Sequence, residues 1–369
     1  MRAELCPFAP GDEAAWDAYV RRAPTAGHCH LSGWRRVVAR SYGHRPLYLW
    51  VLGPAGVAGV LPLILFRGLG GRHALVSMPF LDDGGVVADS DEVARALGRA
   101  ALGLGRRCGA AALELRHRRP GALALPAHGG KVTLALALAG DPRRMWAGFD
   151  PKLRNQVRKA QKSGLEVGWT GPDGLADFYR VFARNMRDLG SPVHGRRFFG
   201  AVLEEFGDGA RLAIVRRAGR AIAGGLCLAF RDTLLMPWAS SLRTERWACP
   251  STLLYWEAIR WACEKGFVRF DFGRSSPGSG PYRFKRQWGA AVEPLHWQRS
   301  AIVRPAPRSG AAAAGPAADV ASRAAGVAAE PTRPDRPGPL ARAAVAAWRR
   351  LPVALATRLG PVLRGRLSQ

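Results

Sequence analysis

The chain has 369 residues, more than one small hydrophobic core usually fills, so its length favours two domains and leaves room for a tail. Apolar residues make up 48% and charged residues 22% of the sequence, which excludes a wholly disordered, collagen-like or polytopic membrane protein. The net charge of +27 favours anionic partners such as nucleic acid, phosphate-bearing cofactors or acidic lipid, without choosing among them.

The cysteines and the apolar segments indicate a cytoplasmic protein without a metal. The six cysteines form no CxxC pair and do not resemble a disulfide framework. The N-terminus, Met1–Pro7, lacks the apolar core of a secretory signal. The stretch 47–66 is long enough for a membrane span, but the turn signal at 53–56 divides it, so we expect two strands joined as a hairpin.

Helices followed by strands are expected twice along the chain. In the first half we expect helices at 13–22, 32–42 and 91–107, and strands at 47–52, 57–66, 74–78, 111–115 and 131–138. In the second half we expect helices at 151–163, 175–189, 195–205 and 252–265, and strands at 211–216, 221–230, 234–240 and 268–272. The repeated order indicates two similar halves, although no residue-level repeat is visible.

A change of composition after the second half separates a linker and a tail. We place the domains at 1–140 and 141–300, an Ala/Pro/Arg-rich linker at 301–339 and a basic amphipathic tail at 340–369. The last 69 residues carry +8 and the body +19. Apolar residues at helical spacing in the tail predict an interfacial membrane anchor. Docking on a protein partner, or disorder, explains the tail equally well.

The helix expected at 151–163 carries a cluster of cations. Arginine forks and lysine point charges suit phosphate oxygens, so this face is a candidate anion site. The alternative is a solvated basic face, which is the commoner fate of a charge run. The candidate substrate-binding residues on this helix are Lys152, Arg154, Asn155, Arg158 and Lys159.

A polar helix end runs into a Gly-Ser-Pro turn near residue 190. It could present Asn185, Arg187 and His194 to a cleft, and a histidine titrates in the range that a proton shuttle needs. The alternatives are an ordinary helix C-cap and a polar loop histidine.

The segment 267–289 is the richest in reactive side chains. Strand alternation places Phe270 and Phe272 on one face and Asp271 on the other, beside a glycine-rich loop. An acid there can accept a proton from an amine or orient one, while Tyr282 and Lys285 could serve a leaving group or a phosphate. An ion pair of Asp271 with Arg269 or Arg274 explains the pattern equally well.

Two segments of the chain resemble a known family. The sequences KLRNQVRKA (residues 152–160) and YRFKRQWG (residues 282–289) resemble the Fem-type (FemAB-related) transferases, and more closely those associated with the exosortase/PEP-CTERM exopolysaccharide system. The unit 251–274 is also similar to the acetyltransferase-type (BioF2-like) domain of that group. The resemblance implies an α+β fold of two GNAT-like acyl-CoA N-acyltransferase domains, each a mixed central sheet flanked by helices.

The resemblance also implies an activity. It implies an N-acyltransferase that moves an acyl or aminoacyl group onto an amine of a cell-envelope or exopolysaccharide precursor. The anionic partners would be acyl-CoA or aminoacyl-tRNA as co-substrate and a nucleotide-linked or lipid-linked sugar. The sequence has no heptad arm of the kind common in relatives that use tRNA, and no Gly-rich pyrophosphate loop precedes the helix at 252–265, so the donor stays open.

Acyl transfer to nitrogen requires a deprotonated amine, donors for the developing oxyanion and two aligned substrates. In this hypothesis Asp271 accepts the proton or orients the amine, Tyr282 contacts the leaving group or substrate, and Arg274 and Lys285 join the basic helix in binding anionic groups. Two other function classes compete: a nucleic-acid-binding protein and a non-catalytic scaffold recruited to the membrane. We expect a cytoplasmic location, peripheral at the inner face of the membrane.

Overall fold

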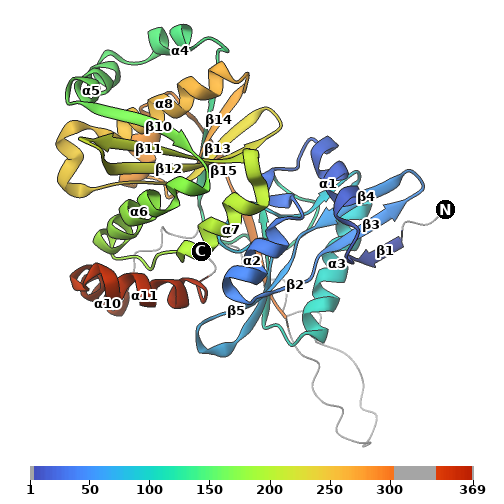
Figure 1. The fold of residues 1–369 in the computed structure, drawn as a ribbon. Helices are drawn as coiled ribbons and strands as arrows, with labels where there is room; N and C mark the ends of the chain where they lie inside the picture. Colours follow the sequence, from blue (N-terminus) through green and yellow to red (C-terminus); the bar gives the residue numbers. More distant parts are fainter. Residues whose placement is uncertain (1–3, 303–337, 368–369) are drawn as a thin grey trace, which may run out of the picture.

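The computed structural model describes residues 4–302 and 338–367 and has an α+β architecture of sheets flanked by helices (Figure 1). The linker predicted at 301–339 falls almost entirely outside the described residues. No helix within the described ranges is both long and apolar enough to cross a membrane.

The first half contains a four-stranded sheet of order β1-β3-β4-β7 and a five-stranded sheet of order β16-β8-β6-β5-β2. Its helices are α1 (Glu13–Arg22), α2 (Trp34–Tyr42) and α3 (Asp91–Arg107). Its strands, before the chain enters the second half, are β1 (Glu4–Pro7), β2 (Arg45–Pro46), β3 (Leu49–Gly53), β4 (Gly56–Leu61), β5 (Ile64–Arg67), β6 (His73–Val76), β7 (Val87–Ala88) and β8 (Ala112–His117).

Local sequence explains both the successes and an error in this half. Helix α3 has the predicted bounds, because the Ser90 side chain accepts a hydrogen bond from the amide of Val93 and an apolar face at Leu97 and Ala101 is buried. The single strand predicted at 57–66 is wrong. It divides at Pro62, where the chain leaves the sheet of β4 and enters that of β5, since proline has no N–H to donate to a ladder.

The second half is built on a seven-stranded sheet of order β10-β11-β12-β13-β14-β9-β15. Helices α5 and α8 cover one face and α6 the other (Figure 1). Its helices are α4 (Pro142–Gly148), α5 (Pro151–Lys162), α6 (Leu175–Leu189), α7 (Arg196–Phe206), α8 (Pro250–Glu264) and α9 (Gly280–Arg286). Its strands, and the two exchanged between the halves, are β9 (Val132–Ala137), β10 (Leu165–Thr170), β11 (Ala210–Arg217), β12 (Arg220–Phe230), β13 (Thr233–Ser241), β14 (Arg269–Ser275), β15 (Ala291–Pro294) and β16 (His296–Ala301).

The two halves exchange strands. Strand β9 precedes the second half in sequence but lies between β14 and β15 of its sheet. Strand β16 follows the second half but pairs with β8 of the first, with His296 opposite His117. Each half therefore contributes a strand to a sheet of the other half. The domain boundary predicted near residue 140 stays a prediction.

Strands β13 and β14 are parallel and part after a short contact. They pair at Thr233 with Arg269, at Leu234 with Phe270 and at Leu235 with Asp271, and no pairing continues beyond that point. The predicted alternation on β14 is confirmed: Phe270 and Phe272 pack around Tyr255 of α8, and Asp271 faces the opposite side. The parting of the two strands therefore opens beside the Asp271 carboxylate.

The C-terminal tail docks on its own chain. The sequence predicted a membrane anchor, with docking on a protein partner or disorder as the alternatives. The helices of the tail are α10 (Pro339–Arg350) and α11 (Val353–Arg364), and both lie against α6 (Figure 1). Gly360 is buried against Val193, where a Cβ would lie 2.8 Å from the Val193 Cγ1. His44 of the first half is hydrogen-bonded through Nε2 to the Gly365 carbonyl at 2.7 Å. The tail thus contacts both halves of the molecule.

Candidate active site between the two halves

Two cavities lie between the halves and share a wall. The smaller, of about 280 Å³, opens where β13 and β14 part and is lined by both halves and by the tail. The larger, of about 780 Å³, lies toward the beginning of β14 and around β15. The residues that line both cavities are Cys29, Asp83, Arg118, Leu235 and Asp271. Three of these five are charged, so the shared wall is an ionic cluster.

Arg118 is the centre of that cluster. It follows the last residue of β8 in the first half, and its guanidinium forms an ion pair with Asp271 of the second half. It also lies 3.5 Å from the Asp83 carboxylate and donates to Glu293 at 3.2 Å. Burial would lower the pKa of Arg118, but the carboxylates of Asp271 and Asp83 outweigh burial and raise it, so this cation stays charged.

Asp271 is 1% exposed and its carboxylate is fully ionised at neutral pH. Its Oδ1 accepts hydrogen bonds from the Thr133 hydroxyl and the Gly273 amide, both at 2.8 Å. Burial would raise the pKa of Asp271, but the ion pair with Arg118 and these hydrogen bonds lower it below the ordinary value. An acid held in this state is a weak base, so the geometry favours the orienting role over the proton-accepting one. The ion pairs predicted with Arg269 or Arg274 are not formed; the partner is Arg118.

A strained loop carries two further carboxylates to the smaller cavity. Met78 and Phe80 both have left-handed backbone conformations, with φ of 50° and 75°, which are uncommon for bulky residues and cluster at functional sites. The loop presents Asp82 and Asp83 to the cavity. Asp83 is 5% exposed, and among the described residues its Oδ1 has no hydrogen-bond partner.

Arg274 enters the same cavity from the end of β14. Its backbone amide donates to the Asp82 carboxylate at 2.8 Å, and its Nε lies 3.3 Å from the same group. Its guanidinium lies over the indole of Trp297, 5.1 Å from the ring centroid. The Nη1 atom is buried and has no hydrogen-bond partner within the described residues. Arg274, predicted as a substrate-binding residue, therefore lines the cavity with an unused donor.

His194 lines the smaller cavity but does not offer a free nitrogen to it. Its Nδ1 is hydrogen-bonded to the Tyr42 hydroxyl at 2.5 Å, and its Nε2 accepts from Arg364 of the tail at 3.0 Å. Burial, and then the charges of Arg364 and Arg274, lower the pKa of His194 well below its ordinary value. The histidine is therefore neutral and positions Arg364, which itself lines the cavity.

Lys285 of α9 is buried beside the parting of β13 and β14. Its Nζ donates to the carbonyls of Gly273 and Arg274, each at 2.9 Å. Burial lowers the pKa of Lys285 to about 8, against the opposing effect of Asp82 and Asp271. Lys285 itself lines neither cavity, and its two hydrogen bonds support the backbone of Gly273 and Arg274, of which Arg274 lines the smaller cavity.

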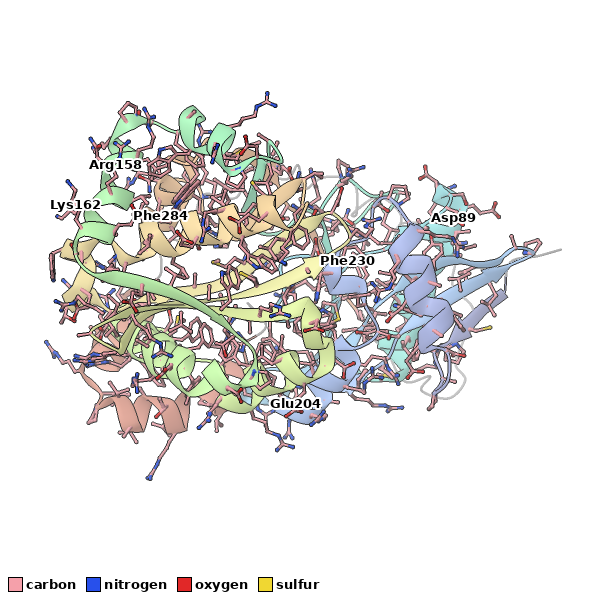
Figure 2. All side chains as sticks on the ribbon, turned by 45° about the horizontal axis from the view of Figure 1, so that its top comes forward. Asp89, Arg158, Lys162, Glu204, Phe230 and Phe284 are labelled. Carbon is pink, nitrogen blue, oxygen red and sulfur yellow. The ribbon has the colours of Figure 1, made fainter. Side chains whose placement is uncertain are left out.

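The remaining predicted site residues also lie outside both cavities. Asn185 is buried on α6, where its amide donates to the Ser240 hydroxyl at 2.9 Å and joins the helix to β13. Tyr282 is half-buried on α9 and lines neither cavity. The cations of α5 lie on the outer face of the second half, and Figure 2 shows Arg158 and Lys162 directed away from the molecule. None of the predicted residues of α5 lines either cavity; these residues are Lys152, Arg154, Asn155, Arg158 and Lys159.

The structure also brings to the site several residues that were not predicted, among them Asp82, Asp83, Arg118, Thr133, Glu293 and Arg364. Asp83 belongs to an Asp-Asp-Gly-Gly segment, a pattern typical of a turn, and Arg118 to a basic run after a strand. Arg118 had a local signal because it directly follows a buried strand, and Asp83 had one because loops often carry functional residues. Thr133 is an ordinary strand residue, and Arg364 lies 170 residues from its partner His194. For these two no local signal exists.

Comparison with known proteins places this architecture. Residues 151–286 match the family model of the acetyltransferase (GNAT) domain. No curated protein matches the sequence significantly.

Solved structures match the chain over most of its length. The crystal structure of FemX has a TM-score of 0.65 at 16% identity and covers 80% of this chain and 96% of its own. The tandem GNAT protein from the clavulanic acid biosynthesis pathway has a TM-score of 0.52 at 15% identity and covers 83% and 100%. The C-terminal domain of a putative lysylphosphatidylglycerol synthetase from Agrobacterium fabrum has a TM-score of 0.51 at 14% identity and covers 78% and 90%. The chain therefore has the α+β fold of tandem GNAT proteins, and its residues 151–286 match the GNAT acetyltransferase domain.

Proposed function

We propose that the protein is an N-acyltransferase whose reaction takes place beside Asp271, at the wall shared by the two cavities. The observation that carries the proposal is the Asp83–Arg118–Asp271 cluster, formed by both halves at the parting of β13 and β14 in the matched GNAT domain. Two substrates must meet in an acyl transfer, and two cavities with a common wall provide a place for each.

The chemistry requires little from the protein. The amine nitrogen attacks the carbonyl carbon of the donor, a C–N bond forms, and the bond from that carbon to the carrier's sulfur or oxygen breaks. The amine loses one proton, and the leaving group takes up one. In this proposal Asp83 and Asp271 hold the amine, Arg118 keeps Asp271 ionised, and Lys285 adds positive charge behind the end of β14.

The donor is either acyl-CoA or an aminoacyl-tRNA. The segment before α8 carries Glu245, a buried carboxylate that is paired with Arg217 at 2.7 Å, and Pro250 in the first turn of the helix removes one N–H. These features do not favour a phosphate there, so both donors belong in the test. We assign the exposed α5 cations to the phosphates of the donor.

The test is a transfer assay with each donor and a small amino sugar as acceptor, read by mass spectrometry of the acceptor. We expect acylated amine with one donor class. We also expect Lys152→Gln combined with Lys159→Gln to raise the KM for that donor without lowering kcat, because these side chains line neither cavity. Consumption of neither donor would overturn the proposal and would favour the nucleic-acid-binding or scaffold alternatives.

The resemblance seen in the sequence extends the proposal to the acceptor. We propose that the acceptor is an amine of a cell-envelope or exopolysaccharide precursor. The enzyme would then be a Fem-type transferase associated with the exosortase/PEP-CTERM system. The solved relatives support this only through their fold.

The docked tail supports a location at the inner face of an anionic membrane. Its outer face leaves Leu355 41%, Leu359 44% and Val362 68% exposed beside Arg358. We expect the full chain to sediment with anionic vesicles and the variant Leu355→Asp with Leu359→Asp to stay in the supernatant. Equal sedimentation of the two proteins would end the membrane assignment.

A further inference from the structure

Two polar atoms of opposite character in the smaller cavity have unused hydrogen-bonding capacity. The Asp83 Oδ1 is a buried acceptor without a donor, and the Arg274 Nη1 is a buried donor without an acceptor, among the described residues. The groups beside Asp83 are Arg118, 3.5 Å from its Oδ2, and the thiol of Cys29, a weak donor. A buried polar atom without a hydrogen-bond partner is costly, so its presence in a native protein calls for an explanation, and a ligand that completes the pairing is one.

Arg364 adds a second positive charge to the side of the cavity where Arg274 lies. The guanidinium is held at Nε by His194, and its ring neighbour is Phe80, at 5.9 Å. Burial, and then the charges of Arg274 and Arg116, lower the pKa of Arg364 to about 10, against the opposing effect of Tyr42. Two of the neighbouring arginines are each paired with a carboxylate, Arg116 with Glu114 and Arg274 with Asp82. An anionic ligand between Arg274 and Arg364 would offset the repulsion between these two cations.

We propose that this cavity binds an acceptor carrying both a primary amine and a phosphate or carboxylate, with Asp83 receiving the amine and Arg274 and the tail residue Arg364 receiving the anionic group. The inference rests on the proposed function, because it names the substrate class of that same site. Guanidinium groups suit both anions, since their N–H donors match paired oxygens.

The cavity limits the size of this acceptor. A volume of about 280 Å³ is at the small end for ligand sites, which start near about 300 Å³. It admits an amino sugar with one anionic substituent. A larger precursor would place only that end in the cavity.

The tail is required for this site because it supplies Arg364 and one wall. The close packing of Gly360 on Val193 and the His44 hydrogen bond to Gly365 hold the end of α11 in place. A side chain at position 360 would meet the Val193 Cγ1 and backbone amide. We therefore expect Gly360→Val to displace the end of α11 from its contact with Val193. The substitution changes none of the residues that line the cavity.

Calorimetric binding to the full chain, without any donor, tests the proposal. The probes are glucosamine 6-phosphate, muramic acid, glucosamine and glucose 6-phosphate. We expect one of the two bifunctional probes, the phosphate or the carboxylate, to bind at least about tenfold more tightly than both glucosamine and glucose 6-phosphate. The tighter one identifies the anion. Equal affinity for bifunctional and monofunctional probes would overturn the proposal.

Variants assign each group. We expect Arg364→Gln and Gly360→Val to weaken the bifunctional probe by at least about tenfold while leaving glucosamine unchanged, and Asp83→Asn to abolish the preference over glucose 6-phosphate. The control is Arg358→Gln, an exposed arginine on the same helix, with wild-type affinity. Wild-type affinity in Arg364→Gln would remove the tail from the site. Because no donor is present, tight binding with a negative transfer assay would contradict the proposed function alone, and transfer without anion preference would contradict this inference alone.

Discussion

Replacing Asp271 with asparagine is expected to lower kcat by about 100-fold or more while the protein stays folded. The amide oxygen of Asp271→Asn can still accept from Thr133 and Gly273, but its NH₂ group faces the Arg118 guanidinium, so two donors oppose each other. Arg118 keeps Asp83 and Glu293, so no bare charge is left. We expect the free energy of unfolding to fall by about 1.5–3 kcal/mol, measured by chemical denaturation beside kcat and KM.

A matched variant separates the effect of the site from that of losing a carboxylate. Asp208→Asn removes an ion pair with Arg211 whose acid is almost fully exposed, and neither residue lines a cavity. We expect its kcat and stability to remain near wild type, because exposed pairs contribute about 0–1 kcal/mol. Full activity in Asp271→Asn would exclude this carboxylate from the reaction.

The free energy of unfolding of the wild type is expected to rise between about pH 8 and 10.5 relative to that of Lys285→Met. The folded protein holds Lys285 with a pKa of about 8, whereas the ordinary value is 10.5. Between these values the unfolded chain binds the proton more strongly than the folded protein, so stability increases as the proton is removed. The full difference corresponds to about 3 kcal/mol, and below about pH 8 this lysine contributes no pH dependence.

Urea denaturation at half-unit steps from pH 7 to 10.5 measures this rise. Lys265→Met, at an exposed position after α8, is the control and should keep the wild-type rise because Lys285 is still present. Parallel curves for wild type and Lys285→Met would show that the buried lysine does not titrate in this range. In that case its two carbonyl contacts would be its main contribution.

Local patterns in the sequence predicted helices and strands well where the spacing of apolar residues along the chain decides which side chains are buried. Helices α3 and α6 have the predicted bounds, and the alternation of β14 placed Asp271 opposite two buried phenylalanines. These successes share one reason: burial of a helix stripe or a strand face follows from spacing alone.

The sequence could not show which residues that are distant along the chain contact each other in the folded protein. The pattern of β14 showed that Asp271 faces away from the core helix, but the residue that meets it, Arg118, lies in the other half. The amphipathic tail was correctly predicted as helical, yet its spacing could not distinguish a membrane surface from the surface of α6. The cations of α5 were correctly placed on a surface, but charge density does not show where a substrate binds.

The exchange of β9 and β16 has a consequence for biosynthesis. The five-stranded sheet of the first half includes β16, so it cannot be completed until the residues near 301 have emerged from the ribosome. The cavity wall that α11 contributes is synthesised later still. The nascent first half must wait with an open sheet edge at β8, and such edges promote aggregation. Expression of either half alone is therefore a poor route to soluble material, and dependence on chaperones during translation is the expected behaviour of this topology.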